Sequence, residues 1–174
     1  MVIQTTWFFA ALAVILVCLL AWGAVLVWEQ HRTLLRQEYR VAYTLPDFTD
    51  AAGFRLDQYP SNEIVIPARY WLINNKVAEV EYDIVAGQTA YLRAAKQGEM
   101  LLPESYRDEP YESIAEYELD GIPVLQRQSP GRKALLTWSR EEFDYALLLP
   151  EPEMNQTSGL AVDFVANTHA VQSR

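Results

Sequence analysis

One apolar stretch near the N-terminus limits what this chain can fold into more than any other feature. Between Trp7 and Trp28 the sequence has 22 residues, and none has an ionisable side chain except Cys18. A helix rises about 1.5 Å per residue, so this stretch covers the hydrocarbon core of a bilayer, which is about 30 Å thick. The two tryptophans lie at its ends, where indole rings prefer the headgroup level. The sequence therefore predicts a single transmembrane helix over residues 7–28, after a tail of residues 1–6.

Three other interpretations of the same stretch fit the residues less well. A cleaved signal peptide has a basic N-terminal region and a shorter apolar run, whereas residues 1–6 contain no Lys or Arg. A lipoprotein signal has a small residue before its cysteine, but Val17 precedes Cys18 here. A buried helix of a soluble protein is rarely apolar on all sides over this length. We therefore expect an anchor that stays in the membrane.

The next residues, 29–44, contain good helix formers and no Gly or Pro, which predicts a helical juxtamembrane stalk. Arg32, Arg36 and Arg40 follow the span, and only the α-amino group precedes it. The positive-inside rule then favours a cytoplasmic C-terminal part. We expect Trp7, Trp28, Arg32 and Arg36 to lie at the membrane interface.

Residues 45–174 are typical of a globular domain in which turn residues separate short strands. A short helix closed by Gly53 precedes the strands, and a helix over residues 158–168 with apolar residues on one face follows them. The predicted class is α+β: a single N-terminal transmembrane helix, then an antiparallel sheet with a short N-terminal helix and a C-terminal helix packed on one face. The expected strands are 64–73, 77–84, 89–95, 114–119, 122–126, 134–138 and 143–149.

Charge and motif content exclude several function classes. The net charge is −9, which argues against a nucleic-acid binder and against docking of the domain to anionic lipid. A single Cys excludes a disulfide scaffold. The sequence has no nucleophile elbow, phosphate-binding loop or zinc-protease motif, and neither His31 nor His169 has metal-ligand spacing. We expect no enzyme, no cofactor and no metal, with an envelope hydrolase that uses carboxylates as the remaining catalytic alternative.

The segment from residue 99 to residue 120 is strongly acidic, because Arg107 alone opposes its carboxylates. It lacks the Asp-x-Asp-x-Asp-Gly spacing of a calcium loop. We expect a solvated stretch that blunts a sheet edge, and weak Ca²⁺ binding stays open as the alternative. The carboxylates are Glu99, Glu104, Asp108, Glu109, Glu112, Glu116, Glu118 and Asp120.

Aromatic residues are the candidates for a recognition surface. Most aromatic side chains on strands build the core or cross-strand pairs. Four others are the candidates to line a ligand or peptide groove. These four are Tyr70, Trp71, Tyr106 and Tyr111.

Five short motifs follow one another in a familiar order along the domain. They are Asp50–Leu56 followed by Pro60, Val77–Tyr82, Tyr91–Ala95, Asp120–Val124, and Leu136–Trp138 with Phe143–Leu147. From Asp47 to Thr168 the chain thereby resembles a bacterial domain-of-unknown-function family. That family occurs in membrane-anchored and lipoprotein-like proteins and at the C-termini of anti-sigma factors. The chain departs from the family at Arg140–Phe143, where the usual turn is Asp-Gly-Gly-Tyr.

The resemblance implies an extracytoplasmic domain without an established enzymatic activity, which opposes the orientation that the arginines favour. The leading hypothesis is a single-pass protein of the bacterial cell membrane. Its extracytoplasmic domain would be a non-enzymatic binding or sensory module for a protein or peptide partner. The alternative is an accessory structural subunit of a larger membrane complex, with the domain in the cytoplasm.

Overall fold

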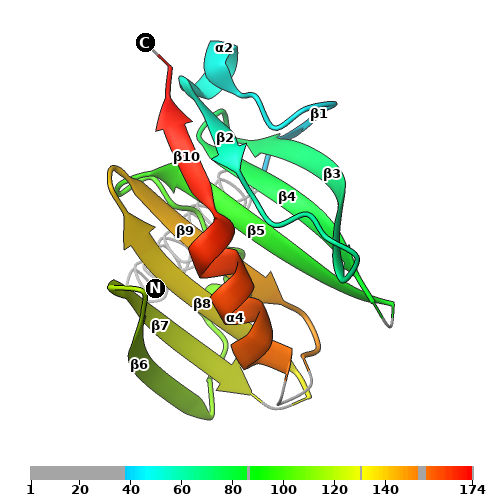
Figure 1. Ribbon diagram of the computed structural model, residues 1–174, viewed down its shortest axis with the longest axis vertical. Helices are drawn as coiled ribbons and strands as arrows, with labels where there is room; N and C mark the ends of the chain where they lie inside the picture. Colours follow the sequence, from blue (N-terminus) through cyan, green and yellow to red (C-terminus); the bar gives the residue numbers. More distant parts are fainter. Residues whose placement is uncertain (1–37, 86, 130, 153–155, 174) are drawn as a thin grey trace, which may run out of the picture. The chain divides into compact units, whose positions relative to one another are not determined.

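Eight antiparallel strands form one sheet in the computed structural model, which describes residues 38–173 except for 86, 130 and 153–155. A separate two-stranded ribbon pairs β2 (Phe54–Gln58) with β10 (His169–Gln172). The helices of the described residues are α2 (Thr49–Ala52), α3 (Glu104–Arg107) and α4 (Gln156–Asn167) (Figure 1). In spatial order the sheet strands are β1 (Arg40–Tyr43), β3 (Val65–Ile73), β4 (Val77–Ile84), β5 (Gln88–Lys96), β9 (Phe143–Leu149), β8 (Lys133–Arg140), β7 (Ile122–Ser129) and β6 (Ser113–Leu119).

Two meanders build the sheet, and they meet where β5 pairs with β9. The first meander is β3–β4–β5 and the second is β6–β7–β8–β9. The turn between β6 and β7 is Asp120–Gly121, and both residues have positive φ, 49° and 81°. A two-residue turn of this kind has the twist of the strands that it joins. Residues 97–112 connect the two meanders. The second meander joins the first through its last strand, β9, so its first strand, β6, lies at the outer edge of the sheet.

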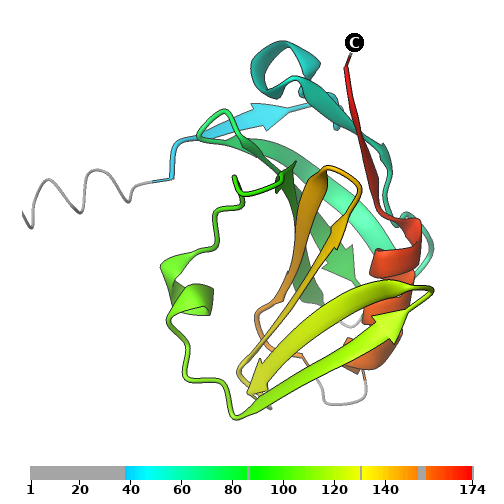
Figure 2. The ribbon, with the colours of Figure 1, turned by 90° about the vertical axis from the view of Figure 1, so that its left-hand side faces the viewer.

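Different segments cover the two faces of the sheet (Figure 2). The first, the α4 face, packs against α4 and the β2–β10 ribbon. The second, the α3 face, is crossed by residues 97–112, which contain α3. Side chains alternate between the two faces along each strand, so Leu136 points to the α4 face and Leu135 to the α3 face.

The α4 face holds the main hydrophobic core. Leu160, Phe164 and Val165 of α4 are spaced so that they share one side of the helix, and all three are buried against the sheet. Phe164 meets Tyr82 of β4 edge to face, with ring centroids 5.1 Å apart. Trp138 stacks on Tyr145 at 5.4 Å across β8 and β9. Aromatic contacts of this kind stabilise the core beyond the area that they bury.

The predicted fold class is wrong in its N-terminal transmembrane helix. The domain is mostly antiparallel sheet, with 54% strand and 15% helix. No helix within residues 38–173 is long and apolar enough to cross a membrane; the longest described one, α4, has 12 residues, against the roughly 20 that a span needs. The predicted span, residues 7–28 with Trp7 and Trp28, lies outside the described residues.

The assignments that rested on this helix are corrected with it. These are the integral-membrane partner, the single-pass description and the location in the bacterial cell membrane. Arg32 and Arg36, which we expected at the membrane interface, also lie outside the described residues.

The expected helical stalk differs at its end. Arg40–Tyr43 is strand β1, which pairs antiparallel with β3 in a register that places Arg40 opposite Ile73. Pairing with an existing strand satisfies the backbone of these residues, and this tertiary contact overrides their helix propensity. Residues 39–174 form one compact unit, so the sheet begins before the predicted boundary at residue 45.

Candidate binding groove

An apolar groove of about 610 Å³ lies between the N-terminal half of α4 and the open end of the β3–β4 hairpin. This volume is within the range of ligand-binding pockets, about 300–1,000 Å³. Leu160 and Ile84 also line a smaller neighbouring pocket of about 290 Å³, whose other described walls come from residues 87–91 and 149–152. The described lining residues are Asn62, Ile64, Val65, Ile84, Val85, Gly159, Leu160 and Asp163.

Gly159 keeps the helix side of the groove open. It lies in the first half of α4, and a Cβ atom added there would meet no other atom within 4 Å. Glycine costs about 1 kcal/mol relative to alanine inside a helix, so it weakens α4 while leaving space beside it. The groove therefore has room for a foreign side chain at this position.

Exposed aliphatic side chains form the rim of the groove. Ile64 and Val85 are each 58% exposed, and the backbone N–H of Val85 donates to the carbonyl of Ile64 at 3.1 Å. Both residues lie where the open end of the hairpin meets the groove. Adjacent exposed apolar side chains mark surfaces that bind ligands or partners.

Asp163 gives the groove a fixed negative charge. The side-chain amide of Asn62 donates to Asp163 Oδ2 at 3.0 Å, and that of Asn167 donates to Oδ1 at 2.7 Å. Asn62 is itself held in a turn, because its Oδ1 accepts the N–H groups of Ile64 at 2.9 Å and Val65 at 3.0 Å. Two neutral amides thus orient the carboxylate, and no Lys or Arg of the described residues forms an ion pair with it.

The four aromatic residues predicted to line one groove are not brought together. Tyr70 points to the α4 face, where its hydroxyl lies 3.3 Å from that of Tyr59. Trp71, the next residue, points to the α3 face, since neighbouring residues of a strand alternate. Tyr106 and Tyr111 lie on the crossing segment, where the Tyr111 hydroxyl donates to the carbonyl of Tyr106 at 2.8 Å. None of the four lines the groove beside α4.

Burial changes the acidity of these tyrosines. Burial is the main cause that raises the pKa of Tyr70 to about 12, and the hydrogen bond with Tyr59 adds to it. Burial also raises the pKa of Tyr111 to about 12, helped by the charge of Glu109. The pKa of Tyr106 rises for the same first reason. All three hydroxyls therefore stay neutral at ordinary pH and act as packing and hydrogen-bonding groups.

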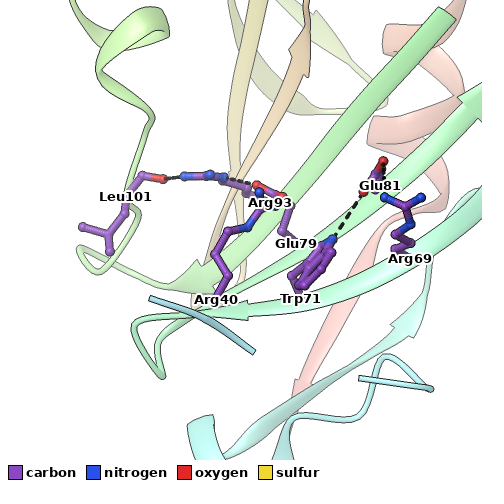
Figure 3. A network of polar contacts seen from close by, with 7 residues as sticks. All are labelled: Arg40, Arg69, Trp71, Glu79, Glu81, Arg93 and Leu101. Carbon is purple, nitrogen blue, oxygen red and sulfur yellow. Dashed lines mark hydrogen bonds and ion pairs between the residues drawn. The ribbon is translucent and has the colours of Figure 1, made fainter. Parts of the chain in front are cut away.

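Trp71 belongs to a network of polar contacts on the α3 face (Figure 3). Its centre is Glu79, which is 2% exposed and accepts hydrogen bonds from Arg93 Nε at 2.6 Å and from Arg40. Arg93, also 2% exposed, donates to the carbonyl of Leu101 at 2.5 Å. The Arg40 guanidinium lies over the Trp71 ring, 5.0 Å from its centroid. We assign the network a structural role, because its charges pair with one another and with the backbone.

Several carboxylates of the acidic segment have cationic partners. Glu99 pairs with Lys76 at 3.0 Å and Asp108 with Arg107 at 2.7 Å. Glu109 lies 3.2 Å from Arg132 and 3.5 Å from Lys133. Within the described residues no three His, Cys, Asp or Glu side chains are placed to hold a metal ion.

Of the two histidines, the described residues include His169 alone. His169 lies 3.2 Å from Glu141, and His31 is outside the described residues.

The groove could not be found from the sequence. Its walls come from three separate stretches, residues 62–65, 84–85 and 159–163, whose contact depends on how α4 lies on the sheet. The one available signal was an isolated glycine inside a predicted helix, since such a glycine often has a packing or functional reason.

No protein-family model matches the chain, and neither a curated protein nor a solved structure is significantly similar. The resemblance to the bacterial family stays a prediction.

Proposed function

We propose that this chain is a non-enzymatic binding module that holds an apolar segment of a polypeptide partner in the groove beside α4. The observation that carries the proposal is the groove itself: a volume of about 610 Å³ with aliphatic walls and one carboxylate at its edge. Pockets with mostly apolar walls and few polar groups are the usual binding sites of proteins.

The rim favours a polypeptide over a small molecule. Ile64 and Val85 are each more than half exposed, and a compact ligand inside the groove would leave much of their surface in contact with water. A segment of chain that lies along the groove covers the rim as well as the floor, and so removes more apolar surface from water.

Asp163 indicates which charge the bound segment has beside its aliphatic residues. Its carboxylate already accepts from two amides but has no ion pair with a described Lys or Arg. A partner with a Lys or Arg beside its aliphatic residues would supply that charge, and a charge-assisted hydrogen bond is stronger than a neutral one. The expected segment is therefore aliphatic with one basic residue.

The groove also argues against catalysis. Asp163 is the only titratable side chain among its described lining residues. Hydrolysis by paired carboxylates, the catalytic alternative from the sequence, requires two such groups flanking the reacting bond.

A selection from a random peptide library, displayed on phage and panned on the 174-residue chain, tests this function. We expect enriched peptides that combine aliphatic residues with one Lys or Arg. Their binding should be lost in Gly159→Trp, which fills the groove, and kept in Gly159→Ala, whose single methyl group meets open space. Asp163→Asn should remove the preference for the basic residue. The function would be refuted if no peptide is enriched, or if the enriched peptides bind Gly159→Trp as well as the parent chain.

A further inference from the structure

Strand β6 is an outer strand of the sheet, on the side away from β1. It pairs with β7 along its whole length, from Ser113 opposite Gln128 to Leu119 opposite Ile122. Within the described residues, no backbone group of β6 forms a hydrogen bond to any segment other than β7. The strand thus presents a free edge of seven residues to solvent.

The hairpin turn determines which β6 residues have free backbone groups. The Asp120–Gly121 turn lies between the paired residues Leu119 and Ile122. In a β-turn of this kind the C=O of the first residue, Leu119, accepts a hydrogen bond from the N–H of the last, Ile122. Hydrogen-bonded and non-hydrogen-bonded pairs then alternate along the hairpin. Glu118 falls in a non-hydrogen-bonded pair, consistent with Pro123 opposite it, which has no N–H.

The residues with outward N–H and C=O groups are therefore Glu118, Glu116 and Ile114. Their side chains share one face, the α3 face, because every second residue of a strand points the same way. Ile114 is 66% exposed, and both glutamates are exposed as well. Each position combines a free donor and acceptor with an accessible side chain.

A hollow lies beside this edge on the same face. It has a volume of about 410 Å³ and includes Glu116, Leu125 of β7 and Thr137 of β8 in its lining. A long side chain from a strand added at β6 can reach across Glu116 into it. This hollow is separate from the groove beside α4, and the two have no described lining residue in common.

We propose that β6 is a docking edge that accepts a basic extended segment of another polypeptide as a ninth strand. Added antiparallel, the segment would place its residues in order opposite Glu118, Glu116 and Ile114. Opposite charges and apolar pairs stabilise cross-strand neighbours, so the fitting sequence is Lys-x-Lys-x-Val, with Arg or Ile as equivalents.

The same charges argue against a second copy of this chain as the occupant. Antiparallel pairing of β6 with β6 that puts Glu116 opposite Glu116 also places Ile114 opposite Glu118. Like charges directly opposite each other destabilise a sheet, and charged residues on an edge strand prevent such self-pairing. The edge is thereby selective for a partner of opposite charge.

The test uses the 174-residue chain and a labelled peptide, Thr-Lys-Thr-Lys-Thr-Val-Thr, in fluorescence anisotropy titrations. A peptide with Glu in place of both Lys residues is the charge control, and the reversed sequence tests the direction. We expect the basic peptide to bind about tenfold or more tightly than the acidic one, because two attractive pairs become repulsive. Binding of the basic peptide should weaken with salt.

Ile114→Pro separates strand addition from simple charge attraction. It removes one outward N–H while both glutamates and the bonds to β7 remain. We expect Ile114→Pro to weaken binding about tenfold, and the matched Ile114→Ala, which keeps that N–H, to weaken it by about threefold or less. Circular dichroism of both variants checks that the sheet is intact.

A second variant keeps the proposal testable if Ile114→Pro does not fold. The pair Glu116→Lys and Glu118→Lys should reverse the preference, so that the acidic peptide binds more tightly. Equal binding of the basic and acidic peptides would overturn the proposal, as would equal effects of Ile114→Pro and Ile114→Ala. Sedimentation that shows a dimer dissociated by Ile114→Pro would also overturn it, in favour of a second copy.

Discussion

The two faces of the sheet are covered in different ways. On the α4 face, a helix with apolar side chains at regular spacing packs on aromatic and aliphatic residues, and most of the buried groups there are non-polar. On the α3 face, the covering segment is an irregular acidic stretch whose apolar residues pack in two smaller clusters, such as Tyr106 on Leu135 and Leu101 near Val77. Beneath it lies a buried ion pair between Arg93 of β5 and Glu79 of β4, and Arg93 also donates to the Leu101 carbonyl of that segment.

This difference has a consequence for how each face tolerates change. Apolar packing is non-directional, so its strength depends on the volume filled and the area buried. A buried charge network depends on every member, because removing one partner leaves the other charge without compensation. The α4 face should therefore respond to side-chain size, and the α3 face to side-chain charge.

The largest expected effect is on the α4 face. Phe164→Ala should lower the free energy of unfolding by about 3–5 kcal/mol, because it opens a cavity under α4 and removes the contact with Tyr82. Urea denaturation followed by circular dichroism measures the change. Val162→Ala, on the exposed side of the same helix, should change it by less than about 0.5 kcal/mol. Equal losses in the two variants would mean that α4 does not form the core.

The next effect is on the α3 face. Glu79→Ala should lower the free energy of unfolding by about 3 kcal/mol, because Arg93 stays buried without its carboxylate. Arg40→Ala should cost less, about 1 kcal/mol or below, since the Arg40 side chain is 37% exposed and water screens its pairing.

A double variant shows whether charge or volume matters at this site. Replacing both Glu79 and Arg93 by Leu leaves no buried charge without its partner, since Arg40, which also loses Glu79, is 37% exposed, so the double variant should be more stable than Glu79→Ala. Thermal unfolding of the parent chain, Glu79→Ala and the double variant gives the order of their stabilities. A double variant less stable than Glu79→Ala would show that the bond to Leu101, and not the charge balance, holds the crossing segment.

The smallest expected effect is on how the free energy of unfolding changes at alkaline pH, and it involves one tyrosine on each face. The pKa of Tyr70 and the pKa of Tyr111 are both raised to about 12 from the ordinary 10.0. Between pH 10 and pH 12 the unfolded chain loses these protons first, so the stabilisation is complete below pH 10 and is lost as the pH rises toward 12. Tyr70→Phe and Tyr111→Phe should each make the free energy of unfolding fall less steeply over this window.

The physical cause distinguishes the two tyrosines. Burial is the larger cause for both, but the second cause is a hydroxyl neighbour for Tyr70 and the charge of Glu109 for Tyr111. Added salt should therefore lower the apparent pKa of Tyr111 more than that of Tyr70, as measured by absorbance at alkaline pH. Tyr39→Phe, at an exposed position, is the matched control. Equal salt responses of the two tyrosines would contradict this explanation.

Local patterns in the sequence correspond to much of the sheet and little of the candidate site. The Asp-Gly dipeptide at residue 120 predicted a hairpin, and the structure has a two-residue turn there because these residues tolerate positive φ. The helix expected at residues 158–168 lies within a few residues of α4. The stalk expected to be helical becomes strand β1 at Arg40–Tyr43, because its backbone pairs with a strand 30 residues away in sequence. A pattern within a short window contains no information about such a partner.

The sequence by itself determined the alternation of side chains along each strand and the positions of the turns. These depend on residues close together in the chain: on the two-residue period of a strand and on the φ angles that Asp, Asn and Gly allow. Tertiary structure alone decided that Arg93 and Glu79 are buried partners. It also decided that α4 and the β3–β4 hairpin enclose a groove. The physical reason is that burial, pairing and concavity depend on contacts between distant segments, and the order of the strands in the sheet sets those contacts.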